Sequence, residues 1–193
     1  MNTKGAAILA DPHPCGHIVY PYTDENLVGQ AVCLFASAGL RNGEGVVLIM
    51  TDTHCEPIKL RLQIEGFDVE HYERSGQLTC VTTDALLGTF MAGGGLDEEM
   101  FRSTIGDLID RARAAVSKGH VGKVRIFGEM VSQLRATDLT VTTRMEELWN
   151  EVIDKHSVSL LCTYALHNAQ DHVPQSLIAL HSANIEREKS VAP

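Results

Sequence analysis

The stretch Lys123–Val131, which reads Lys-Val-Arg-Ile-Phe-Gly-Glu-Met-Val, decides the fold. Its β-branched and aromatic residues are typical of a strand. It lies between two long helical patterns, and a strand between helices is most simply a central strand of a parallel α/β sheet. Such sheets bind ligands beyond the carboxyl ends of their strands, and this strand ends in Gly128 and Glu129. We therefore predict that Glu129 anchors a ligand site, with a merely solvated carboxylate as the alternative.

The rest of the chain alternates between strand and helix patterns. Four more strands are predicted at His17–Tyr22, Val46–Met50, Leu78–Thr82 and Val158–Ala165. Helices are predicted at about residues 24–41, 57–66, 84–91, 97–118, 138–155 and 174–185, with an extended piece at Val69–Tyr72. This alternation predicts an α/β fold of three layers, in which a largely parallel sheet carries helices on both faces.

The chain is expected to form one domain, because it shows neither an internal repeat nor a linker. We place that domain at residues 17–187. Residues 1–16 are expected to be a flexible arm, in which Pro12 and Pro14 prevent regular pairing, and residues 188–193 a tail.

Composition excludes several classes of partner. The formal net charge is −9, whereas neutralising phosphates requires a basic face, so nucleic acid and anionic membrane surfaces are not expected partners. No apolar run approaches the ~20 residues of a membrane span. The five cysteines are scattered and odd in number, which is typical of reduced thiols in a cytoplasmic protein.

Common catalytic signatures are missing from the sequence. The single Gly-Lys pair, Gly122-Lys123, is followed by Val124 and leads into a strand, so it does not form a phosphate loop. A nucleophile motif Gly-x-Ser-x-Gly is also missing. We therefore expect that the protein is not an enzyme.

Metal-capable side chains gather at residues 13–17 (His-Pro-Cys-Gly-His), at 54–55 (His-Cys) and at 162–167, which begins with Cys and ends with His. Three groups from different strand ends could meet and bind zinc, but no pair has the spacing of a zinc finger. Ordinary histidines and core thiols are the simpler interpretation, so no metal is predicted and the cofactor stays unknown. A Cys–His–carboxylate enzyme built from the same residues is a weaker alternative.

Several motifs follow one another in an informative order. They are His17-Ile-Val-Tyr-Pro-Tyr22, Gly39-Leu-Arg-Asn-Gly-Glu-Gly45, Arg125-Ile-Phe-Gly-Glu-Met130, Glu146-Glu-Leu-Trp-Asn150 and Ser159-Leu-Leu-Cys-Thr-Tyr164. Together, over about residues 17–185, they resemble the MEDS domain, the sensory domain named from methanogen and methylotroph proteins and the dichloromethane-responsive repressor. The resemblance implies a RecA-like core that has lost the phosphate loop. It also implies a sensor of small organic ligands, often fused to histidine kinases or DNA-binding domains.

We therefore interpret the chain as a non-catalytic sensory or regulatory domain of bacterial signal transduction, which binds a small organic ligand at the carboxyl edge of its sheet. The candidate ligand-binding residues are His17, Tyr20, Tyr22, Asp52, Glu129 and Tyr164. His17 and Glu129 are expected to pair or share the ligand if their strand ends meet.

Two alternatives remain open: a RecA-like nucleotide-binding protein with a degenerate phosphate site, and an interaction module that docks on a histidine kinase. A histidine kinase or another signalling protein is the candidate partner. We also expect a homodimer, because symmetric dimers are the commonest assembly.

Overall fold

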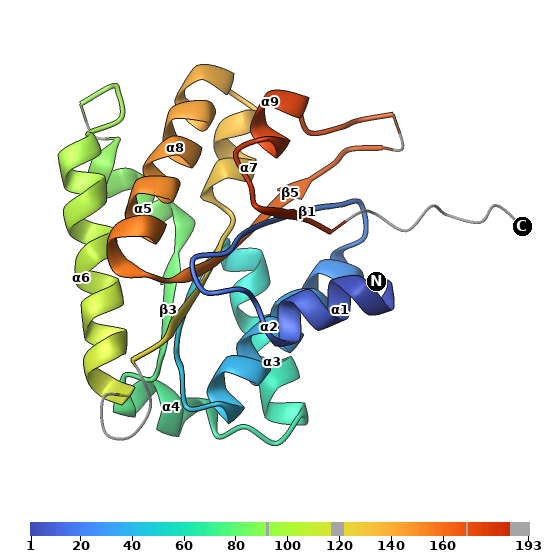
Figure 1. The fold of residues 1–193 in the computed structure, drawn as a ribbon, viewed down its shortest axis with the longest axis vertical. Coiled ribbons are helices and arrows are strands. Elements are labelled where there is room, and N and C mark those ends of the chain that lie inside the picture. Colours follow the sequence, from blue (N-terminus) through green and yellow to red (C-terminus); the bar gives the residue numbers. More distant parts are fainter. Residues whose placement is uncertain (92, 117–121, 169, 186–193) are drawn as a thin grey trace, which may run out of the picture.

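The computed structural model describes residues 1–91, 93–116, 122–168 and 170–185 (Figure 1). In these residues the strands are β1 (His17–Tyr22), β2 (Gly45–Met50), β3 (Leu78–Thr82), β4 (Val124–Gly128), β5 (Ser159–Ala165) and β6 (Ala183–Asn184). They form one sheet in the order β3-β2-β4-β5-β1-β6, and every pair is parallel. The predicted α/β fold is confirmed, and the sheet is compatible with the RecA-like core that the resemblance implies.

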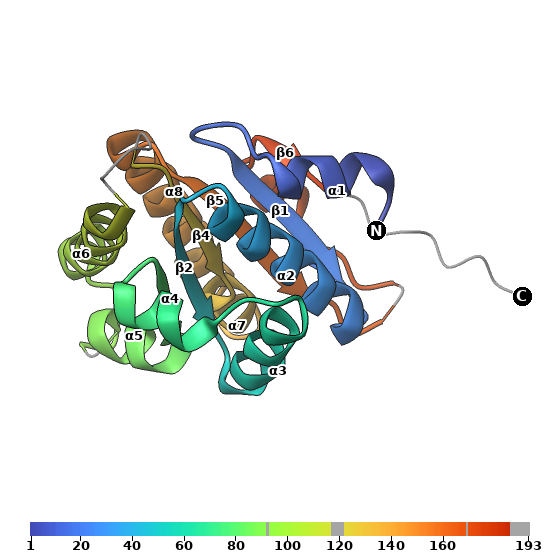
Figure 2. The same ribbon diagram turned by 90° about the horizontal axis from the view of Figure 1, so that it is seen from below.

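Helices cover both faces of this sheet. They are α1 (Thr3–Ala10), α2 (Glu25–Arg41), α3 (Asp52–Ile64), α4 (Val69–Ser75), α5 (Thr83–Phe90), α6 (Glu98–Val116), α7 (Met130–Arg135), α8 (Leu139–His156) and α9 (Gln175–Ile178). Figure 2 shows α2 and α3 on one side of the sheet, called here the α2 side, and α6 and α8 on the other, the α8 side. Each side has its own hydrophobic core, because successive strand residues point to opposite faces.

The N-terminal segment differs from the flexible arm that we expected. Residues 3–10 form α1, whose first turn is capped by the Asn2 side chain, which accepts a hydrogen bond from the Gly5 N–H. Leu9 is fully buried in the core of the α2 side. The segment therefore packs as a part of the domain, because its short apolar patch finds a surface that local sequence does not reveal.

Two further elements differ from the sequence predictions. Residues 69–75, expected to begin with an extended piece, form α4, because Asp68 caps its first turn and Gly76 ends it in a left-handed conformation. The helix expected at residues 174–185 stops at Ile178, and residues 183–184 instead form β6 beside β1. This edge pairing is a long-range contact, so helical spacing in the sequence could not predict it.

Smaller differences concern boundaries. Helix α3 begins at Asp52, five residues before the Pro57 that we expected in its first turn. The tail at residues 188–193 and the proposed domain boundary at 187 lie outside the described residues. Among the described residues, no helix is long and apolar enough to cross a membrane.

A buried arginine joins the N-terminal part of the chain to the sheet. Arg125 of β4 is 2% exposed and forms an ion pair with Glu44, which precedes β2. Its Nη1 also donates to the carbonyls of Leu9 (3.1 Å), Ala10 (3.2 Å) and Phe35 (3.3 Å). One guanidinium therefore satisfies acceptors from α1, from α2 and from the residue before β2.

Replacing Arg125 should destabilise the fold severely. Arg125→Met leaves Glu44 as an uncompensated buried charge, and breaking such a pair costs roughly 3–5 kcal/mol. Arg74→Met is the matched control: it removes an exposed pair with Glu70 and should change stability by less than about 1 kcal/mol. Urea unfolding of both variants measures the difference, and equal losses would contradict this role of Arg125.

Candidate functional site

The strand order creates a crevice between β2 and β4. From β2 the chain runs through α3, on the α2 side, toward β3, whereas from β4 it runs through α7, on the α8 side, toward β5. Neighbouring parallel strands whose connections leave in opposite directions open a ligand-binding crevice at their carboxyl ends. A pocket of about 600 Å³ lies there. Its lining comes from the last residues of β1 and β5 and from residues that follow β1, β2 and β4: Tyr22, Glu25, Asn26, Gly29, Thr51, Thr53, His54, Pro57, Ile58, Arg61, Glu129, Ser132, Gln133 and Ala165.

Glu129 is the central polar group of this pocket. It follows β4 directly and is only 2% exposed. Although it stands at the N-cap position of α7, its side chain does not cap that helix. Its Oε2 instead accepts hydrogen bonds from the backbone N–H (2.8 Å) and the hydroxyl (3.1 Å) of Thr51, at the end of β2. The carboxylate therefore bridges the two strands on either side of the crevice.

His54 links Glu129 to a second carboxylate. Its Nδ1 lies 2.5 Å from Glu129 Oε1, and its Nε2 lies 2.5 Å from Glu25 Oε2. The hydrogen bond to Glu129 raises the pKa of His54 to about 9, although burial acts in the opposite direction. His54 is therefore an imidazolium near neutral pH, held between two carboxylates.

The remaining walls combine apolar and polar surface. Tyr22, Pro57 and Ile58 supply apolar area. Burial is the main reason that the pKa of Tyr22 is raised well above its usual value, so its hydroxyl stays protonated. Arg61 Nη2 donates a hydrogen bond to Asn26 Oδ1 (3.2 Å), and this bond holds the positive charge of Arg61 at the rim of the pocket.

The structure places two of the six candidate residues in this pocket, Tyr22 and Glu129. Tyr20 is 3% exposed and packs in the core of the α2 side, so it contributes to packing. Asp52 is exposed in the first turn of α3 and is not part of the pocket lining.

His17 and Tyr164 lie on the α8 side of the sheet, away from the pocket. Their shared neighbour is Glu146 of α8, which accepts a hydrogen bond from the Tyr164 hydroxyl and lies 3.2 Å from His17 Nε2. The expected pairing of His17 with Glu129 is therefore wrong. Its physical reason is geometric: His17 begins β1, and at about 3.3 Å per residue it lies roughly 16 Å from the carboxyl end of that strand.

Sequence reasoning missed several residues of the site. The sequence indicates His54 only as a metal-capable neighbour of Cys55, and it does not single out Glu25 as a site residue. His54 follows the end of β2 at Met50 by four residues, and Glu25 follows the end of β1 at Tyr22 by three; this position just after a strand end is the signal that indicates them. Glu146 and His181 carry no such signal. Glu146 reaches Tyr164 from the interior of α8, and His181 reaches Glu146 from the loop before β6.

Comparison with known proteins identifies the family of this chain. No curated protein matches the chain significantly. A family model described as MEDS, the MEthanogen/methylotroph, DcmR Sensory domain, matches residues 16–182, which is most of the chain. The chain therefore belongs to the MEDS family of sensory domains.

Proposed function

We propose that this sensory domain binds a small organic ligand in the pocket at the carboxyl ends of β2 and β4, and that it carries out no reaction. The observation that carries the proposal is the buried carboxylate of Glu129 in the crevice where the strand connections diverge. Open α/β sheets use this crevice as their binding site, and membership of a sensory family supports a role in detection.

The size and surface of the pocket support a small, partly apolar ligand. Small-molecule sites commonly enclose about 300–1,000 Å³ and combine apolar walls with a few fixed polar groups. Here the volume is about 600 Å³, and the polar groups are held by bonds within the protein. Ser132, for example, accepts a hydrogen bond from the Ala165 N–H (2.9 Å). A pre-organised site of this kind loses little entropy when it binds.

The charge of the pocket disfavours the nucleotide-binding alternative. The carboxylates of Glu25 and Glu129 balance the imidazolium of His54 and the guanidinium of Arg61. A triphosphate needs an excess of positive charge and backbone amides around its β and γ phosphates, which the missing phosphate loop would supply. A ligand with little net charge therefore suits the pocket better.

The signalling partner stays a prediction. A second copy of the chain, a histidine kinase or another signalling protein could receive the signal. In support, α3 begins at the pocket and also presents the exposed side chains of Leu60 (56%) and Ile64 (77%). A ligand that shifts α3 would thereby alter an apolar protein surface.

Glu129→Gln should weaken ligand binding while keeping the shape of the pocket. Hydrogen bonds to a charged group contribute about 1.5–3 kcal/mol, so the dissociation constant should rise roughly 10- to 100-fold. Saturation-transfer NMR with a panel of small alcohols, amines, carboxylates and halocarbons identifies the ligand, and titration of the best binder measures the change. Glu70→Gln, on the exposed face of α4, is the control and should bind as the parent does. Equal affinities of the parent and Glu129→Gln would place the site elsewhere.

The protein should release no phosphate from Mg²⁺-ATP above background. Its pocket offers neither the loop amides nor the lysine that stabilise the transferred phosphoryl group. A coupled phosphate assay at millimolar ATP tests this. Turnover that disappears in Glu129→Gln would overturn the non-catalytic proposal and favour the nucleotide-binding alternative.

A further inference from the structure

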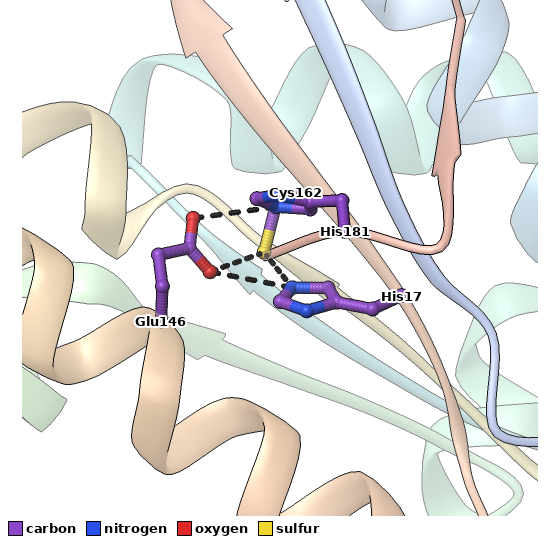
Figure 3. Close-up of side chains that lie close together, drawn as sticks. All are labelled: His17, Glu146, Cys162 and His181. Atoms are coloured by element: carbon purple, nitrogen blue, oxygen red, sulfur yellow. Dashed lines mark hydrogen bonds and ion pairs between the residues drawn. The ribbon is translucent and has the colours of Figure 1, made fainter. Parts of the chain in front are cut away.

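A second cluster of chemically capable side chains lies on the α8 side of the sheet and takes no part in the pocket. Figure 3 shows His17 of β1, Glu146 of α8, Cys162 of β5 and His181 from the loop before β6, all pointing toward one another. One ligand atom from each residue lies within 4.8 Å of the other three. His17, Glu146 and Cys162 are buried, and the His181 side chain has no exposed surface.

Several distances within this cluster are close to those around a tetrahedral ion, with His17 and Cys162 near one oxygen of Glu146 and His181 near the other. With metal–ligand bonds of about 2.0–2.3 Å, the ligand atoms of tetrahedral zinc lie roughly 3.3–3.8 Å apart. In the cluster, His17 Nε2 lies 3.2 Å from Glu146 Oε2 and 3.4 Å from Cys162 Sγ. Cys162 Sγ lies 3.8 Å from Glu146 Oε2, and His181 Nε2 lies 3.4 Å from Glu146 Oε1.

Hydrogen bonds outside the cluster orient both imidazoles as metal ligands. His181 Nδ1 lies 2.9 Å from the carbonyl of Leu177, which can only accept, so Nδ1 carries the proton. His17 Nδ1 lies 2.9 Å from Asn150 Oδ1, and the Asn150 amide donates its own hydrogen to the Leu180 carbonyl. In its neutral form, each ring therefore turns the lone pair of Nε2 into the cluster. Histidine ligands of zinc are held in this way by partners behind the ring.

Hydrogen bonding within the cluster leaves one buried nitrogen unsatisfied. Among the residues that the structure describes, the buried His181 Nε2 finds no hydrogen-bond partner, although it lies 3.4 Å from Glu146 Oε1. A buried carboxylate needs positive charge beside it. Protonating both imidazoles would supply the charge, but their ring centroids are 4.0 Å apart, so two imidazoliums would repel each other. One divalent cation satisfies both nitrogens at once.

We propose that His17, Glu146, Cys162 and His181 bind one zinc ion in a closed structural site. Two imidazoles, a thiolate and a carboxylate are ligands that Zn²⁺ prefers, and the two negative charges neutralise the ion in a buried place. On binding, the Cys162 thiol forms a bond to zinc and releases one proton to solvent. The Tyr164 hydroxyl, which donates to Glu146, holds the carboxylate in place.

The site connects parts of the chain that are distant in sequence. Ser182 accepts from the His17 N–H (2.9 Å) and donates its backbone N–H to the His17 carbonyl (2.8 Å), which fixes His181 beside β1. An ion here would hold the edge strand β6, the strands β1 and β5, and α8 together. Its binding energy would therefore add directly to folding stability.

The untagged full chain, expressed in zinc-supplemented medium, should carry close to one zinc per chain by elemental mass spectrometry. Cys162→Ser should lower zinc affinity at least about tenfold, since even loss of an orienting partner commonly costs 10- to 100-fold. Cys33→Ser is the matched control. Cys33 is also buried, but it lies on the α2 side, where its thiol donates a hydrogen bond to Glu65.

Cobalt provides a test on the unmutated chain, so the proposal does not depend on the folding of a variant. The chain is unfolded in denaturant that contains a chelator, and it is then refolded with Co²⁺ as the sole metal ion. We expect a thiolate-to-cobalt absorption band in the near ultraviolet, visible bands of tetrahedral intensity, and a higher melting temperature than after refolding with the chelator. The bands should persist in Cys33→Ser. The proposal would be overturned if the refolded parent lacked these bands and the purified protein also contained no zinc. It would equally be overturned if the bands persisted in Cys162→Ser. The four residues would then form an imidazolium–carboxylate cluster.

Discussion

The buried carboxylate of Glu129 sets the geometry at the carboxyl edge of the sheet. It is held by Thr51 at the end of β2 and by His54 in the first turn of α3, although it belongs to the chain that leaves β4. A charge that is 2% exposed persists only when its hydrogen bonds and its counter-charge are in place. The protonation of His54 and the charge balance of the pocket therefore depend on one carboxylate.

Side chains alternate between the two faces of the sheet along each strand, and this alternation separates the pocket from the proposed zinc site. Odd-numbered residues of β1, such as His17 and Val19, face the α8 side, whereas Tyr20 and Tyr22 face the α2 side. One short strand thereby contributes to the proposed zinc site near its beginning and to the pocket at its end. The two sites have no lining residue in common, so the first can stabilise the domain while the second responds to a ligand.

The sequence predicted five of the strands well, because β2 is a continuous apolar run and β4 and β5 are mostly apolar, with all three buried on both faces. It also predicted Glu129 and Tyr22 as pocket residues, since strand ends in a parallel sheet share one edge. It failed where a long-range contact decides: α1 packs on α2, β6 pairs with β1, and Glu146 reaches Tyr164 from α8. Those contacts depend on the pairing register of the strands and on the sheet face to which each side chain points. A single sequence shows neither of these until the strand order is known.

The protonation of His54 tests most directly whether Glu129 organises this edge. Nitrogen-15 NMR of the imidazole rings across pH 5–10 measures it. The structure predicts that His54 stays an imidazolium at neutral pH and titrates with a pKa of about 9, and that Glu129→Gln lowers this pKa. Titration of His54 near the ordinary value of 6.5 in the parent would show that the ion pair does not form, and it would contradict the account of the pocket.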